Sequence, residues 1–157
     1  MRKRILESLK SRIDIDTRTL ATFRIFIGLI VFLDLLLRLR SFELFYTSSG
    51  AVPRDLAVNL ATSELFSLYF ISDHILFISA LFVIQAVFAL FLIFGYRSKV
   101  SSIVLFFLLI SLNHRNVLIN SYADTLLRML LFWAMFLPLG EKWSIDSIRA
   151  EIEPRKT

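Results

Sequence analysis

The sequence predicts an all-α membrane protein: a four-transmembrane-helix antiparallel bundle with an N-terminal amphipathic helix and a long outer loop. Two observations predict this class. Of the 157 residues, 57% are hydrophobic, and they gather in four runs close to the ~20 residues that a spanning helix needs. The runs are continuous rather than alternating, and basic residues flank them, which is typical of membrane helices and not of strands. We expect a single membrane domain over residues 1–157.

The four predicted spans cover, in order, residues 20–39, 75–95, 100–116 and 122–139. The third has the shortest apolar centre, IVLFFLLI. Serines precede that centre and Asn113 follows it, and these polar groups can satisfy the helix ends in the interfacial zone, so a short span is still predicted.

The segments between the spans differ in character. The opening MRKRILESLKSRI puts its apolar residues on one face and its bases on the other. This fits a helix lying on the inner leaflet, with a frayed basic tail as the alternative. Residues 41–73 form the long outer connection, where YTSSGAVPR is typical of a turn. Residues 95–99, GYRSK, are expected to form a tight inner turn.

The basic residues predict the orientation. With the N-terminus inside, the inner side collects twelve of the 18 bases and the outer side four. The inner set is Arg2, Lys3, Arg4, Lys10, Arg12, Arg18, Arg97, Lys99, Lys142, Arg149, Arg155 and Lys156, and the outer set is Arg38, Arg40, Arg54 and Arg115. Cytoplasmic loops carry an excess of Lys and Arg, so we expect a multi-pass membrane protein with both termini in the cytoplasm. Bases at helix flanks also argue against nucleic acid as a partner, despite the net charge of +5.

Three stretches carry a resemblance to a known family: RIFIGLIVFLDLLLR, FYTSSGAVPR and SLNHRNVLINSYADTLLRMLLFWAMFLPLGEKWSID. Together they resemble the HTTM domain, the membrane domain of vitamin K-dependent gamma-carboxylase-like proteins. The likeness covers nearly the whole chain, which looks like the N-terminal part of a domain that continues, in the family, through further membrane helices. The layout is also similar to DoxX-type membrane proteins, by architecture alone.

The resemblance implies two functions of different classes. As a scaffold, the chain would supply helices to a second membrane subunit or to another copy of itself. As a DoxX-like or carboxylase-like enzyme, it would act on a lipid-soluble quinone. The family's carboxylases use a membrane-domain lysine to deprotonate the reduced vitamin, and that lysine lies beyond the region matched here. The lysines of this chain lie outside or at the edges of the apolar runs, where a desolvated base cannot form. The sequence therefore favours the scaffold, identifies no catalytic residue, and leaves enzymatic activity open.

Other polar residues give no catalytic pattern. His74 and His114 lie at the outer ends of different spans without a ligand at metal-binding spacing, so no metal site is predicted. Gln85, in the middle of the second span, is expected to make an interhelical hydrogen bond, with a ligand headgroup as the alternative partner. The polar group Asn113, His114, Arg115 and Asn116 is expected to cap the third span at the outer interface.

Charges inside the spans predict a network. Each costs at least ~2.5 kcal/mol at a helix centre, so such residues usually face the bundle and pair. Asp34 precedes Arg38 by four residues, and Asp124 precedes Arg128 by four. In antiparallel first and fourth spans, Asp34 comes level with Arg128 and Arg38 with Asp124. We expect one network of these four residues; two separate intrahelical pairs, with Arg38 and Asp124 solvated, are the alternative.

Arg24 is the remaining charge in the first span. The same register brings it level with Pro138, whose missing N–H leaves the carbonyl of Ala134 without its helical donor. The guanidinium is expected to donate to that carbonyl, aided by the negative end of the helix. Snorkelling of Arg24 to the inner headgroups is the competing prediction.

Overall fold

The computed structural model describes residues 17–40, 42, 68–72, 74–115 and 120–152. These residues are all-helical, with no strand among them, which confirms the α class. The helices are α2 (Thr17–Leu39), the 3-10 helix η1 (Leu68–Phe70), α5 (Ile75–Phe94), α6 (Ser98–Arg115), α7 (Tyr122–Ala134) and α8 (Ile145–Ile152). The predicted amphipathic helix at the N-terminus, most of the long outer loop and Asn116 lie outside the described residues.

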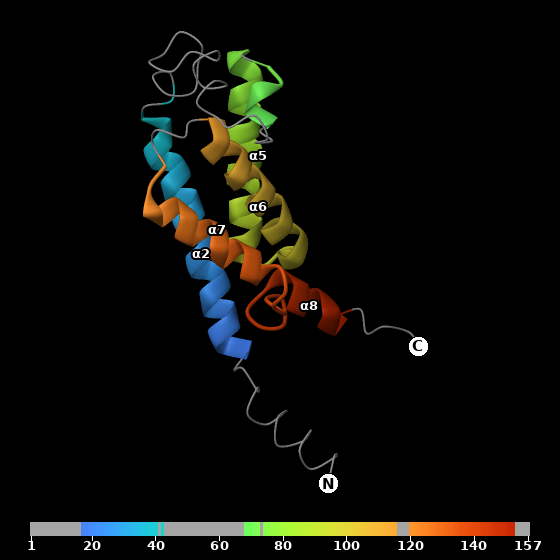
Figure 1. Ribbon diagram of the computed structural model, residues 1–157. Helices are drawn as coiled ribbons and strands as arrows, with labels where there is room; N and C mark the ends of the chain where they lie inside the picture. Colours follow the sequence, from blue (N-terminus) through green and yellow to red (C-terminus); the bar gives the residue numbers. More distant parts are fainter. Residues whose placement is uncertain (1–16, 41, 43–67, 73, 116–119, 153–157) are drawn as a thin grey trace.

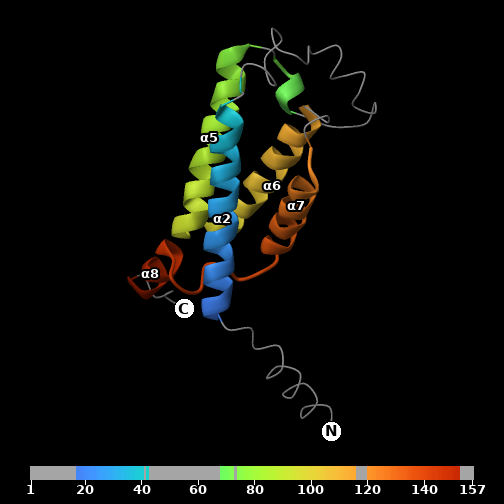
Figure 2. The same cartoon turned by 90° about the vertical axis from the view of Figure 1, so that its left-hand side faces the viewer.

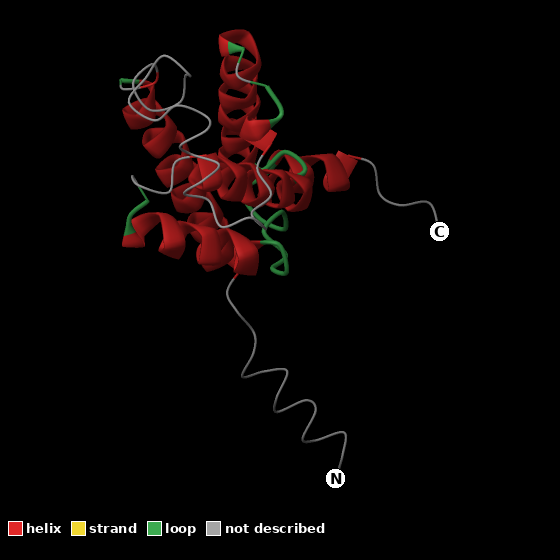
Figure 3. Cartoon of the chain, turned by 45° about the horizontal axis from the view of Figure 1, so that its top comes forward, coloured by secondary structure: helices red, strands yellow, loops and turns green. Residues whose placement is uncertain are grey.

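The four long helices pack as an antiparallel bundle. α2 contacts α5 and α7, while α6 contacts α5 and α7, so each helix has two neighbours (Figures 1 and 2). We call the end that holds the start of α2 and the end of α5 the inner end, and the opposite end the outer end, after the predicted orientation. α8 lies crosswise at the inner end (Figure 1), and the view tilted with the outer end toward the reader shows only helices and loops among the described residues (Figure 3).

The first three predicted segments match the observed helices to within a few residues, and the fourth does not. α7 ends at Ala134, five residues before the predicted end. Beyond it the N–H groups of Phe136 and Leu137 donate three residues back, to Trp133 and Ala134, at 3.1 and 3.4 Å. Pro138 has no N–H to donate. The apolar run therefore continues as turns rather than as helix.

Two helices among the described residues, α2 and α5, are long and apolar enough to cross a membrane. α7 has 13 residues, which at 1.5 Å per residue gives only about 20 Å. α6 has 18 residues, but its last turn carries His114 and Arg115.

The bundle buries several polar and charged side chains beside its apolar core and exposes many large apolar side chains. The core is apolar, with Ile27 and Val31 of α2 packed among residues of the other helices. Alongside this core the bundle buries Arg24, Gln85, Ser101, Ser102, Ser111, Asn113, Arg115 and Asp124. The exterior carries large apolar side chains on every long helix, including Phe26, Leu37, Leu76, Val83, Phe107, Trp133 and Phe136. Soluble domains seldom expose so many large apolar side chains.

Candidate functional site

The outer half of the bundle holds a cluster of charged residues between α2 and α7. Arg38 lies between two carboxylates: its Nε donates to Oδ2 of Asp34 at 2.7 Å, and its Nη2 donates to Oδ1 of Asp124. The side chains of Arg38 and Asp124 are only 12% and 8% exposed. We call Asp34, Arg38 and Asp124 the ion cluster. It joins the first helix to the last long one through a buried charge pair.

Asp124 also organises the start of its own helix. Its Oδ2 accepts hydrogen bonds from the backbone N–H and the hydroxyl of Ser121, at 2.8 and 3.1 Å. A carboxylate in the first turn satisfies a free N–H group and interacts well with the positive end of the helix. One oxygen of Asp124 therefore fixes the N-terminus of α7, and the other faces Arg38.

The structure brings together three of the four residues of the predicted network. Arg128 is half-buried on α7, and among the described residues it makes no ion pair with Asp34 or Asp124. Asp34 turns instead to Arg38, one helical turn along its own helix, where the spacing favours pairing. The alternative of two separate intrahelical pairs also fails, because Arg38 crosses to Asp124 and neither side chain is solvated.

A second polar site, at the inner end, is built around Arg24. Its side chain is fully buried. Nη1 donates to the carbonyl of Leu139 at 3.0 Å, and Nη2 donates to the carbonyl of Trp143 at 2.6 Å. The prediction of Ala134 as the acceptor is wrong, because α7 ends early and the chain beyond it turns two other carbonyls toward the guanidinium. Ala134 accepts from the N–H of Leu137 instead. The buried guanidinium does not snorkel into water.

Gly95 makes room for this arginine. It ends α5 in the left-handed region, at φ 71°, and its N–H bonds back to the last turn of the helix. A Cβ added at Gly95 would lie 2.2 Å from Nη1 of Arg24 and 2.4 Å from Cβ of Ser144. We call Arg24, Gly95 and the carbonyls of Leu139 and Trp143 the Arg24 clamp. It ties α2 to the end of α5 and to the segment after α7.

Asp146, in the first turn of α8, closes the same end. Its Oδ1 accepts from the backbone N–H of Arg97 at 2.8 Å, and its Oδ2 accepts from the N–H and hydroxyl of Ser98 at 2.9 and 3.1 Å. Its own N–H donates to the carbonyl of Gly95 at 3.1 Å. Asp146 thus caps α6 and fixes α8 to the α5–α6 turn. The sequence reasoning missed both Asp146 and α8; the spacing of the isoleucines at 145, 148 and 152 was the available signal.

The remaining polar residues that the sequence indicates lie on α5 and at the end of α6. Gln85 is fully buried on α5, and neither its carbonyl oxygen nor its amide nitrogen has a hydrogen-bond partner among the described residues. The expected interhelical bond is therefore not made there. Asn113 and Arg115 are buried inside the outer end of the bundle rather than placed at its surface, while His114 is half-exposed. The carbonyl of Asn113 accepts from Nδ2 of Asn120 at 2.9 Å, which links the end of α6 to the start of α7.

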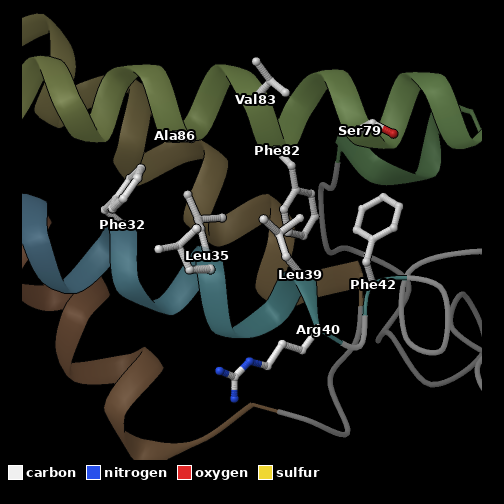
Figure 4. A pocket seen from close by; sticks show the side chains of 10 residues that line it. Phe32, Leu35, Leu39, Arg40, Phe42, Ser79, Phe82, Val83 and Ala86 are labelled. Carbon is white, nitrogen blue, oxygen red and sulfur yellow. The ribbon is translucent and has the colours of Figure 1, made fainter.

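An apolar groove of about 640 Å³ lies between α2 and α5 near the outer end (Figure 4). Its lining consists of Phe32, Leu35, Leu36, Leu39, Arg40, Phe42, Ser79, Phe82, Val83 and Ala86. The rings of Phe42 and Phe82 meet edge to face, with centroids 5.0 Å apart. The guanidinium of Arg40 points away from these rings (Figure 4). The groove therefore suits a hydrocarbon chain rather than a charged group.

Taken together, the two polar sites use their charges to hold helices to one another. The donors of Arg38 and Arg24 described above face carboxylates and backbone carbonyls of this chain, not the apolar groove. Comparison of the chain with protein-family models, curated proteins and solved structures finds no match.

Proposed function

We propose that this chain is an integral membrane module of four spanning helices that acts as a scaffold or subunit. The observation that supports it best is that the bundle buries several polar and charged side chains beside its apolar core while large apolar side chains face outward. Arg24 and Gln85 lie fully inside, whereas Phe26, Val83 and Phe107 face outward. Lipid is the solvent in which outward apolar side chains and inward, partnered charges lower the free energy together.

The lengths of the helices are compatible with this proposal. α2 and α5 reach across a hydrocarbon core of ~30 Å by themselves. The 18 residues of α6 extend about 27 Å. α7 is shorter, and the apolar turn of residues 135–139 continues it toward the inner end. A short span of this kind is accommodated by local thinning of the bilayer.

The scaffold role rests on what the buried charges do. The ion cluster joins α2 to α7, and the Arg24 clamp joins α2 to the inner loops. Both bind parts of the chain to each other. The aromatic side chains on α6 and α7 form a connected set of ring contacts that opens to the exterior. This set, Phe106, Phe107, Phe132, Trp133 and Phe136, is the surface we propose for a second membrane subunit or another copy of the chain.

A quinone-related function is the second candidate, and the groove between α2 and α5 favours it. An isoprenoid tail is a hydrocarbon chain, and the groove is lined almost wholly by apolar side chains. Extraction of lipids from the purified protein tests this candidate: quinone should copurify with the native chain and be depleted by Ala86→Phe, which fills the groove. Equal quinone content in both proteins would remove the support that the groove gives.

Membrane topology tests the principal proposal. Reporter fusions at both termini should report the cytoplasm, and fusions within residues 41–73 should report the opposite side, because the basic residues are concentrated on the inner side. A cytoplasmic signal from the 41–73 fusions contradicts the four-span arrangement.

A further inference from the structure

α8 carries an apolar face that nothing in the described chain covers. Ile145, Ile148 and Ile152 follow the spacing that puts side chains on one side of a helix. Ile148 is 58% exposed and Ile152 is 75% exposed. Trp143, two residues before the helix, is 62% exposed. A short helix with a row of exposed isoleucines next to an exposed indole needs an apolar neighbour.

The position of α8 suggests where that neighbour lies. α8 lies across the inner end of the bundle rather than along it (Figures 1 and 2). Asp146 fixes this orientation by accepting hydrogen bonds from Arg97 in the α5–α6 turn and from Ser98 at the start of α6. A hollow of about 470 Å³ has Phe94, at the end of α5, and Trp143 and Ile148 in its lining. The apolar face of α8 is therefore continuous with the apolar end of a proposed span.

The charges at this end indicate which surface the helix meets. Five exposed bases lie here among the described residues: Arg18, Arg97, Lys99, Lys142 and Arg149. Among the described residues, Glu141 is an exposed acid beside them, whereas the two oxygens of Asp146 accept hydrogen bonds from the backbone N–H groups of Arg97 and Ser98. The surface around α8 is thus basic, and it complements an anionic surface.

We propose that Trp143 and α8 form an interfacial anchor, embedded in the headgroup region of the inner leaflet and bound preferentially to anionic phospholipids. The isoleucines and the indole enter the boundary between headgroups and acyl chains, while Lys142 and Arg149 face lipid phosphates. The anchor rests on the proposed membrane function and deepens it, because it states which lipid the module recognises and with which residues.

Tryptophan quenching in reconstituted vesicles tests the anchor. Trp133→Phe leaves Trp143 as the single tryptophan of the chain. The protein is reconstituted with phosphatidylcholine that carries bromine either near the headgroup or near the chain ends. We expect the shallow bromines to quench Trp143 most strongly. An emission that responds to aqueous acrylamide but to neither brominated lipid overturns the anchor.

A second reporter separates failure of the anchor from failure of the membrane function. Ile30 is exposed near the middle of α2, away from the surface proposed for a second subunit, so Ile30→Trp, together with Trp133→Phe and Trp143→Phe, reports the depth of the bundle. We expect deep bromines to quench it best. If brominated lipid quenches the bundle reporter while Trp143 responds only to aqueous acrylamide, the anchor is rejected and the membrane module is retained. A bundle reporter that remains aqueous rejects the membrane module, whatever Trp143 does.

The preference for anionic lipid has its own matched variants. Adding phosphatidylglycerol should increase the shallow quenching of Trp143. Lys142→Gln with Arg149→Gln should roughly halve that increase, because two phosphate contacts are lost. Arg40→Gln, which removes an exposed base at the opposite end, should leave it unchanged. The preference is refuted if phosphatidylglycerol does not change the quenching of Trp143. It is also refuted if Arg40→Gln reduces the increase as much as Lys142→Gln with Arg149→Gln does. Shielding that rises with the protein-to-lipid ratio would show that a second copy covers the face, which also overturns the proposal.

Discussion

Replacement of Arg38 by methionine should destabilise the fold, because it breaks the charge pair that joins α2 to α7. Methionine keeps the length and the apolar stem of the side chain but removes the hydrogen bonds that the guanidinium donates to Asp34 and Asp124. Asp34 and Asp124 then remain as two carboxylates without their cation. Breaking a buried pair typically costs ~3 to 5 kcal/mol, and an exposed pair is worth ~0 to 1 kcal/mol.

The burial of the ion cluster places the expected loss within that range. Arg38 and Asp124 are 12% and 8% exposed, which corresponds to the buried case, while Asp34 at 27% can partly rehydrate. We therefore expect Arg38→Met to lower the free energy of unfolding by ~3 kcal/mol. Arg128→Met is the matched control: Arg128 makes no ion pair with Asp34 or Asp124 in the described chain, so its loss should cost ~0 to 1 kcal/mol.

Equilibrium unfolding in detergent micelles measures both variants, and a double-mutant cycle tests the contact itself. Asp124→Asn retains an oxygen that can accept from Ser121, so the start of α7 keeps its cap. Combined with Arg38→Met, it removes one stranded carboxylate. The double variant should be more stable than the sum of the single losses by about 1 to 2 kcal/mol. Equal losses for Arg38→Met and Arg128→Met, or strictly additive single losses, would refute the buried pair.

The other predictions concern the Arg24 clamp and catalysis. Gly95→Ala should lower the midpoint of thermal unfolding, because a Cβ there would lie 2.2 Å from Nη1 of Arg24 and a left-handed alanine costs ~1 to 2 kcal/mol. Gly140→Ala is the control, since its Cβ would meet nothing closer than 3.2 Å, and a midpoint as low as that of Gly95→Ala would contradict the clamp. The purified, reconstituted chain should neither turn over reduced vitamin K nor carboxylate glutamate, because no lysine lies within an apolar run. Incorporation of labelled carbon dioxide into a glutamate peptide measures this, and incorporation above that of empty vesicles would overturn it.

The sequence predicts the long helices well where an uninterrupted apolar run marks both of their ends. α5 follows an uninterrupted apolar run that ends at Gly95, a residue that readily adopts the left-handed cap. α7 was predicted too long because Phe136, Leu137 and Leu139 remain apolar after the helical hydrogen bonds have ended. Hydropathy indicates whether a segment is apolar, but it does not indicate where the helical hydrogen bonds end.

The sequence predicts a pair of charged side chains correctly only where the register of two antiparallel helices alone determines which residues are level with each other. Equal depth in antiparallel helices correctly paired Arg38 with Asp124. It failed for Asp34 and Arg128, because Asp34 had a competing partner on its own helix at a favourable spacing. The partners of Arg24 were missed, since they are backbone carbonyls in a loop whose path depends on where α7 ends. Every residue has a backbone carbonyl, so the residue types do not indicate which carbonyl accepts a hydrogen bond.

Arg24 and Arg38 of α2 also set the order in which the molecule can be completed during synthesis. Arg24 bonds to a carbonyl 115 residues further along the chain, and Arg38 pairs with a carboxylate 86 residues further along. The ribosome therefore releases the first helix long before either partner exists. Until α7 and the segment after it have been made, Arg24 lacks the carbonyls that it bonds to, and Arg38 has Asp34 on its own helix but not Asp124. On the proposed membrane location, the insertion machinery has to shelter this helix, or hold it near water, through most of translation, and a nascent chain stalled before residue 124 should remain bound to that machinery.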